Sequence, residues 1–149
     1  MTSKITLDSS VIISHLSADV HKDEVLAAME WLLRSKTELF LPLICYAEVW
    51  TGVELSKQDK RRQIARELQN LIRSSRIMIV SDNVGIARDA ARAQAEYKRR
   101  GGQREALIPD FLIGANATHY SGTLLTTNPR DFLKSFPKLE VLTPKALVC

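Results

Sequence analysis

The stretch KITLDSSVIISHL, residues 4–16, decides the fold. Residues 4–7 predict a short buried strand, and after Asp8 the apolar residues follow a helical spacing instead. An aspartate at this junction is a favoured helix N-cap, because its carboxylate accepts hydrogen bonds from the first free N–H groups. A carboxylate at the end of a strand is also a candidate ligand for a divalent cation. The stretch alone leaves both interpretations open.

The composition indicates an ordinary globular protein. The chain has 149 residues, of which 45% are hydrophobic and 26% charged, and we expect one domain over 1–149. Two cysteines, Cys45 and Cys149, suit neither a disulfide framework nor a zinc site and fit a reducing compartment. No apolar run approaches the roughly 20 residues of a membrane helix, and the first four residues leave no room for a signal peptide. We therefore expect a soluble, cytoplasmic protein without a membrane partner.

The charge balance is mildly basic. The formal net charge is +4 and the isoelectric point is about 9.2. Such an excess is compatible with an anionic partner such as nucleic acid, but many proteins of this size carry it for solubility.

Short apolar runs alternate with longer segments of helical period. Strands are expected at residues 4–7, 39–42, 76–80, 123–127 and 139–143, and helices at 22–35, 43–55, 58–74, 83–100 and 109–120. Ser81 or Asp82 is expected to cap the helix 83–100, and Gly101–Gly102 to end it. This alternation predicts an α/β fold with a parallel sheet covered on both faces. In such folds sites form at the carboxyl ends of the strands, near the switch in strand order.

Three acidic residues are expected on or near that edge: Asp8, Glu48 and Asp131. A fourth, Asp110, starts the helix 109–120, whose approach the sequence does not assign to a strand. Each has a simpler explanation. Asp8 and Asp110 suit helix caps, and Asp131 suits a turn with Asn128 and Pro129. Glu48 lies inside a predicted helix and cannot be a cap, although it could point outward from an amphipathic helix.

Convergence of four carboxylates would favour a hard divalent cation. Their mutual repulsion is relieved by Mg²⁺ or Mn²⁺, which prefer oxygen ligands. His15, His21 and His119 are scattered along the chain and are expected to be surface or packing residues.

The chain resembles PIN-domain proteins, and more closely the VapC-type toxin ribonucleases of type II toxin–antitoxin systems. The resemblance covers nearly the whole chain and rests on four motifs in order: LDSSVII, AEV, PDFLIGANA and LLTTNPRDF. It implies a three-layer α/β/α sandwich with a central parallel sheet of about five strands. It also implies Mg²⁺- or Mn²⁺-dependent hydrolysis of RNA phosphodiesters, a homodimer, and a cognate VapB-like antitoxin.

The resemblance assigns roles to individual residues. Asp8, Glu48, Asp110 and Asp131 match the acidic quartet, and Ser10, Thr126 and Asn128 match polar positions beside it. Asp8 and Asp110 are the first choices for direct metal ligands, with Asp131 binding directly or through water. Glu48 would hold a metal-bound water or accept its proton, while Ser10 and Thr126 orient neighbouring groups.

Three positions depart from the commoner family pattern: Gly114, Asn116 and Thr127. None removes a ligand, so they bear on substrate contacts and not on the metal site. Gly114 is expected to weaken its helix by up to about 1 kcal/mol relative to alanine.

Two clusters of basic residues are candidates for RNA binding. The first comprises Lys57, Lys60, Arg61, Arg62 and Arg66, and the second Lys98, Arg99, Arg100 and Arg104. A solvated helix face explains each cluster equally simply. The predicted helices within 22–74 also carry apolar surface, including Trp31 and Trp50; most of it is expected to be core, although in the family this region pairs protomers and receives the antitoxin's C-terminal segment.

Two other classes of function compete. Phosphotransfer enzymes form an aspartyl-phosphate after the first strand, but a second aspartate is expected two residues on, where this chain has Ser10. A PIN-domain nuclease that is not a toxin, or an inactive RNA-binding scaffold with a PIN-like fold, is the second alternative. The presence of all four acidic residues favours an active nuclease.

Overall fold

A computed structural model describes residues 3–102 and 108–148 of the chain. Within them, a five-stranded parallel sheet has the order β3-β2-β1-β4-β5. The strands are β1 (Lys4–Leu7), β2 (Glu38–Pro42), β3 (Met78–Val80), β4 (Thr123–Leu125) and β5 (Glu140–Leu142). The predicted parallel sheet is confirmed, although β3, β4 and β5 are shorter than expected.

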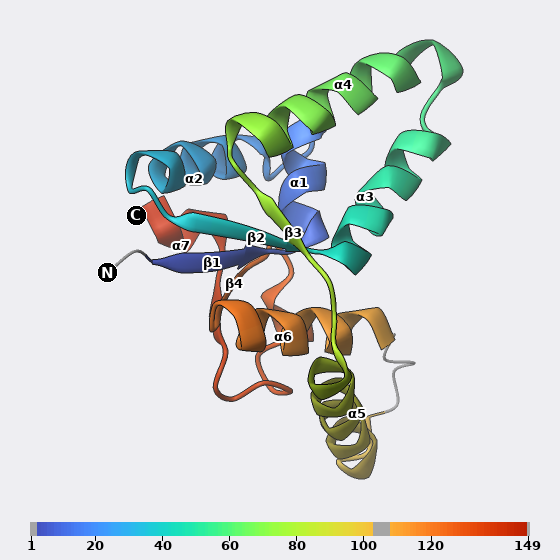
Figure 1. Cartoon of the computed structure of the whole chain (residues 1–149), viewed down its shortest axis with the longest axis vertical. Helices are drawn as coiled ribbons and strands as arrows, with labels where there is room; N and C mark the ends of the chain where they lie inside the picture. Colours follow the sequence, from blue (N-terminus) through green and yellow to red (C-terminus); the bar gives the residue numbers. More distant parts are fainter. Residues whose placement is uncertain (1–2, 103–107, 149) are drawn as a thin grey trace.

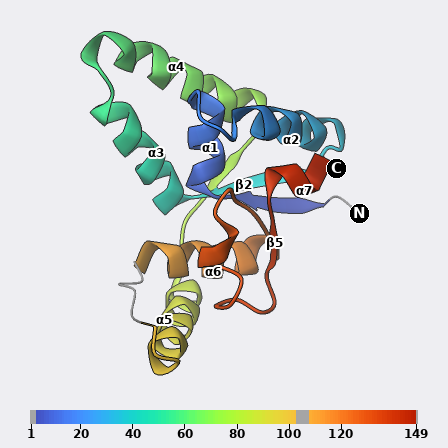
Figure 2. The same ribbon diagram turned by 180° about the vertical axis from the view of Figure 1, so that it is seen from behind.

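Helices cover both faces of this sheet, as expected for a three-layer α/β/α sandwich (Figures 1 and 2). One side carries α1 (Ser9–Leu16), α2 (Lys22–Arg34), α3 (Leu43–Leu55) and α4 (Gln58–Ser74), and the other carries α5 (Val84–Arg99) and α6 (Ile108–Tyr120). The short η1 (Pro129–Asp131) and α7 (Pro144–Val148) were not predicted, because neither is long enough to display a period. Among the described residues, no helix is long and apolar enough to cross a membrane.

The strand order changes direction at β1. The chain runs from β1 to β2 and β3 on one side, then returns to place β4 on the other side of β1. The backbone N–H of Asp8 donates to the carbonyl oxygen of Leu125 at 2.9 Å. The carboxyl ends of β1 and β4, which are followed by Asp8 and Thr126, are therefore held side by side at the switch point.

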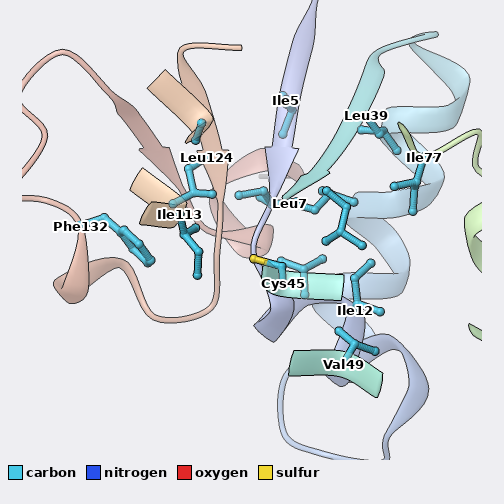
Figure 3. Packing of buried hydrophobic residues seen from close by; sticks show 14 of the residues in the cluster. Ile5, Leu7, Ile12, Leu39, Cys45, Val49, Ile77, Ile113, Leu124 and Phe132 are labelled. Atoms are coloured by element: carbon cyan, nitrogen blue, oxygen red, sulfur yellow. The ribbon is translucent and has the colours of Figure 1, made fainter. Parts of the chain in front are cut away.

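A continuous apolar core anchors the elements that surround this edge. Figure 3 shows Leu7 of β1, Cys45 of α3 and Ile113 of α6 among its buried side chains. Leu7 and Cys45 are fully buried. Fully burying a leucine or isoleucine side chain stabilises a protein by about 1.5–3 kcal/mol. The buried side chains of α3 and α6 therefore hold the carboxyl end of β1 from both faces of the sheet.

The N-terminus of α5 differs from the prediction. Asn83 is the N-cap, and its Oδ1 accepts from the backbone N–H of Ile86 at 2.8 Å. Asp82 instead accepts from Nδ2 of the buried Asn116 at 2.9 Å, which removes it from capping. The predicted stop is confirmed: α5 ends at Arg99, and Gly101 has a left-handed φ of 77°.

Gly114 is explained by packing. A Cβ at this position would lie 2.2 Å from Cε2 of Phe136, closer than side chains approach. Glycine at this position therefore lets the ring of Phe136 pack directly against α6, which the Cβ of alanine would prevent. This packing matters more than the low helix propensity of glycine.

Two non-glycine residues end helices in the left-handed conformation. Lys36 follows α2 with a φ of 55°, and Arg76 follows α4 with a φ of 53°. Next to Lys36, the N–H of Thr37 donates to the carbonyl oxygen of Leu32 at 3.2 Å, the pattern of a Schellman motif. A side chain with a Cβ is strained in this conformation.

Replacing Lys36 with glycine is expected to raise the free energy of unfolding by about 0.5–1 kcal/mol, because glycine adopts the left-handed conformation without that strain. Urea denaturation measures the change. Lys36→Ala is the control, since it removes the charge but keeps the Cβ. An equal gain from alanine would mean that the charge, and not the backbone, limits stability at this position.

Candidate functional site

Asp8 is at the same time a helix cap and the centre of a buried polar cluster. It is 6% exposed, and its Oδ1 accepts from the backbone N–H of Ser9 at 2.9 Å. The capping interpretation is thus confirmed. It does not compete with a site, because the N-terminus of α1 favours an ionised carboxylate there.

Two hydroxyl groups hold the second oxygen of Asp8. Oδ2 accepts from Oγ1 of Thr126 at 2.7 Å and from Oγ of Ser10 at 2.8 Å. Each hydroxyl is positioned in turn by a backbone N–H: that of Thr127 donates to Ser10 at 3.1 Å, and that of Asn128 donates to Thr126 at 3.0 Å. The orienting roles predicted for Ser10 and Thr126 agree with this geometry, while Asn128 contributes its backbone and has an exposed side chain.

Glu48 approaches Asp8 from α3, on the far side of Ser9. The hydroxyl of Ser9 lies 3.3 Å from Oε1 of Glu48 and 3.5 Å from Oδ1 of Asp8. Ser9 was not predicted as a site residue. Its place directly after Asp8, at the start of a helix, was the available signal. Glu48 itself is exposed to solvent, yet it faces the polar cluster.

Asp110 and Asp131 act on the other two acidic residues through their charges. Asp110 lies in the first turn of α6 and Asp131 at the end of η1, and both are half-buried. The charge of Asp110 contributes to raising the pKa of Glu48, and that of Asp131 to raising the pKa of Asp8. Asp110 is the third residue of its helix and not an N-cap, so the capping alternative for it is wrong.

Burial dominates the electrostatics of the cluster. It raises the pKa of Asp8 above its usual value, against the three hydrogen bonds that favour the ionised form. Partial desolvation and then the charge of Asp8 raise the pKa of Glu48. Burial also raises the pKa of the Cys45 thiol, which lies beneath these carboxylates and stays protonated. The charges of neighbouring carboxylates add to these shifts, because a like charge nearby disfavours ionisation.

The donor chemistry suits a hard divalent cation, although the ligands are not gathered into a ready-made set. Among the residues that the structure describes, no group of three His, Cys, Asp or Glu side chains is arranged to hold a metal ion. Four neighbouring carboxylates with hydroxyl supports are nevertheless the oxygen ligands that Mg²⁺ and Mn²⁺ prefer. The three histidines lie elsewhere: His15 on α1, His21 before α2, and His119 against Tyr120.

The two basic clusters lie on helices of opposite layers of the fold (Figure 1). At and just before α4, Lys57, Lys60, Arg62 and Arg66 are exposed, whereas Arg61 lies 3.8 Å from Glu54 and donates to the carbonyl oxygen of Ser56. On α5, Lys98 is exposed and Arg99 pairs with Glu96 at 2.6 Å. Arg100 donates to the carbonyl oxygen of Lys134 at 3.3 Å. Arg104 lies outside the described residues.

A family comparison gives the class of the protein. The model of the PIN domain matches residues 5–137, which include all four acidic residues. The chain therefore belongs to the PIN-domain family. No curated protein matches it.

Comparison with solved structures gives the closer likeness. The chain is similar to one from VapBC2 of Rickettsia felis bound to promoter DNA, with a TM-score of 0.76, 21% identity, and coverage of 94% of this chain and 98% of that one. It is similar to FitAcB of Neisseria gonorrhoeae, with a TM-score of 0.75, 25% identity and coverage of 94% and 97%. DNA-bound VapBC of Salmonella typhimurium gives a TM-score of 0.74, 19% identity and coverage of 96% and 99%. The fold of this PIN-domain protein is thus similar, over nearly its whole length, to the folds of chains in the VapBC and FitAcB structures.

The buried charge of Asp8 predicts how the metal-free protein responds to pH. Its pKa in the folded state lies above the 3.8 of the unfolded chain, so between these values the folded state binds more protons. The free energy of unfolding therefore falls as pH rises through this window and stays lowered above it. In EDTA at pH 7, we expect Asp8→Asn to stabilise the protein by about 1–3 kcal/mol, the cost of an incompletely compensated buried group.

Asparagine keeps an oxygen for the N–H of Ser9, and the Ser10 and Thr126 hydroxyls can rotate to accept from its amide. Thermal unfolding in EDTA from pH 4 to pH 8 measures the effect. Asp89→Asn, on the exposed face of α5, is the matched control and should change stability by less than about 0.5 kcal/mol. A destabilised Asp8→Asn protein at pH 7 would contradict the assigned direction.

Proposed function

We propose that this protein is a metal-dependent endoribonuclease that acts as the toxin of a VapBC-type toxin–antitoxin pair. The observation that carries the proposal is the cluster of Asp8 and Glu48 around Ser9, with Asp110 and Asp131 near enough to act on their pKa values. Membership in the PIN-domain family supports nuclease activity at this cluster.

Asp8 and Asp110 are the proposed direct ligands of Mg²⁺ or Mn²⁺, and Asp131 binds directly or through water. When bound, the cation would activate water as a nucleophile and neutralise charge on the phosphoryl oxygens. Oδ2 of Asp8 accepts short hydrogen bonds from two hydroxyls, whereas Oδ1 accepts from the N–H of Ser9 at 2.9 Å and lies 3.5 Å from its hydroxyl. Oδ1 is therefore the less strongly engaged oxygen and the proposed ligand atom. Ser10 and Thr126 keep the carboxylate in that orientation.

Glu48 is the proposed proton acceptor. The raised pKa of Glu48 is closer to neutral pH than that of an ordinary glutamate, which suits a general base. The exposure of Glu48 leaves room for a water and a phosphodiester beside it, and the hydroxyl of Ser9 limits its motion. The exposed lysines and arginines of α4 and α5 are the candidate contacts to the RNA backbone.

Asp8→Asn is expected to lower RNA cleavage by at least about 100-fold, because it removes the charge that binds the cation while keeping the helix cap. Cleavage of a labelled RNA in Mn²⁺, with an EDTA lane, measures this. Far-UV circular dichroism establishes that the variant is folded. Parental cleavage rates in Asp8→Asn, or undiminished cleavage in EDTA, would overturn the assignment.

A groove between α1, α2 and α4 is the proposed docking place of the antitoxin. It has a volume of about 490 Å³, and its floor is apolar, with Leu16, Met29 and Leu71, while Glu30 and Glu67 stand at its rim. Such a groove fits a segment that combines apolar and basic side chains. The Rickettsia felis and Salmonella typhimurium relatives were solved as VapBC complexes, which supports a partner of this kind.

Leu33→Glu is expected to weaken binding of the antitoxin by at least about tenfold, because it places a charge in the apolar groove. Leu33 is 46% exposed, so the fold tolerates the change. Val84→Glu, 78% exposed on the opposite layer, is the matched control. Fluorescence anisotropy with the antitoxin encoded beside this gene measures both, and equal affinities for the two variants would rule out the groove.

The toxin assignment has its own test. Induced expression with and without the neighbouring antitoxin gene, followed by mapping of new RNA ends, should give growth arrest and new ends only without the antitoxin. Cleavage by the purified protein without growth arrest would leave a nuclease that is not a toxin.

A further inference from the structure

The segment that follows η1 is attached to the molecule through side chains. Its hydrogen bonds between backbone groups are local: Leu133 donates to Pro129, Ser135 to Phe132, and Leu139 to Phe136, at 3.0–3.3 Å. Such turns shape the segment without fixing it to a neighbouring element. Asp131 is the last residue of η1 and directly precedes this segment, while the N–H groups of Thr127 and Asn128 bond to Ser10 and Thr126 on its other side. The side chains that dock the segment are therefore one of the two anchors of Asp131.

Two phenylalanines dock it on α6. Phe132 is 1% exposed and Phe136 is 8% exposed. In Figure 3 the ring of Phe132 lies beside Ile113, and the next residue of α6, Gly114, receives the ring of Phe136. A Cβ at position 114 would lie 2.2, 2.4 and 2.7 Å from three ring carbons of Phe136. Such a clash requires the ring, the segment or α6 to move, and because both partners are buried, the surrounding atoms leave little room for the ring to move alone.

This contact joins the two elements that carry Asp110 and Asp131. Gly114 is one helical turn beyond Asp110, about 6 Å along the axis of α6. Phe136 is in the same short segment as Asp131, and Arg100 of the α5 end also reaches this segment through the carbonyl oxygen of Lys134. The closeness of the ring to the helix therefore bears on the separation of the two carboxylates.

We propose that the Gly114–Phe136 contact is a positioning device that sets the spacing of Asp110 and Asp131, and with it the affinity of the acidic cluster for a divalent cation. The inference rests on the proposed nuclease function. A side chain at position 114 displaces the segment, and a misplacement of about 1 Å at a reacting centre costs about 100-fold in rate. Both residues are buried, so they act as positioning residues, by placing Asp131 relative to Asp110.

The test is a double-mutant cycle on the full chain with Mn²⁺ as the probe. Gly114→Ala is expected to weaken Mn²⁺ binding by about 10- to 100-fold, as changes to residues behind metal ligands do. The value of kcat for RNA cleavage should fall while KM changes little, because the RNA contacts stay in place. Isothermal titration calorimetry and steady-state kinetics measure these quantities below the unfolding transition.

Phe136→Val removes the three ring carbons and is expected to weaken Mn²⁺ binding less than Gly114→Ala does. With the ring absent, alanine at position 114 has nothing to displace, so the double variant should bind Mn²⁺ as the Phe136→Val variant does. Additive losses in the double variant would overturn the proposal. If Gly114→Ala does not fold, parental Mn²⁺ affinity in Phe136→Val overturns it equally.

Gly52→Ala is the matched control. Gly52 also lies inside a helix, α3, but a Cβ there meets nothing within 4 Å. It should leave Mn²⁺ affinity unchanged. A Gly114→Ala protein with a lower melting temperature but parental Mn²⁺ affinity and kcat would show a purely structural contact. If the parent protein neither binds Mn²⁺ nor cleaves RNA, the proposed function itself fails, which the same measurements distinguish.

Discussion

The structure depends on a carboxylate buried at the point where the strand order reverses. Asp8 loses most of its hydration there. Four groups partly compensate for that loss: the N–H of Ser9, the hydroxyls of Ser10 and Thr126, and the N-terminus of α1. These groups come from both sides of the sheet's switch point. The burial cost exceeds their compensation, since the pKa of Asp8 is raised. The remaining imbalance is what a cation would resolve.

Strong local periodicity explains why most of the architecture could be predicted. The helices from α2 to α6 follow the spacing of residues such as Val25 and Met29, and their expected bounds agree with the structure within one residue. The ends of β3, β4 and β5 could not be predicted as well. Thr126 lies just beyond the end of β4, and its hydroxyl bonds Asp8 in a contact across 118 residues that no local pattern contains.

The residues of the candidate site also fall into those that the sequence predicts and those that it does not. Asp8 and its hydroxyl partners could be predicted from short motifs and their resemblance to a family, because they are held by adjacent residues or by strand ends. The roles of Ser9, Asp82 and Phe136 were missed. They arise from contacts with residues distant in sequence, which are Glu48, Asn116 and Gly114 respectively. The glycine at position 114 was interpreted as a local weakness of its helix, whereas its small size serves a tertiary contact.

The strand order also has a consequence for biosynthesis. Asp8 leaves the ribosome early, but the hydroxyl of Thr126 and the carboxylate of Asp131 follow only after most of the 149 residues have been made. Until β4 inserts beside β1, Asp8 lacks the hydroxyl of Thr126 and the cluster lacks the carboxylate of Asp131. A nascent chain that has not yet reached β4 therefore carries an incomplete cluster.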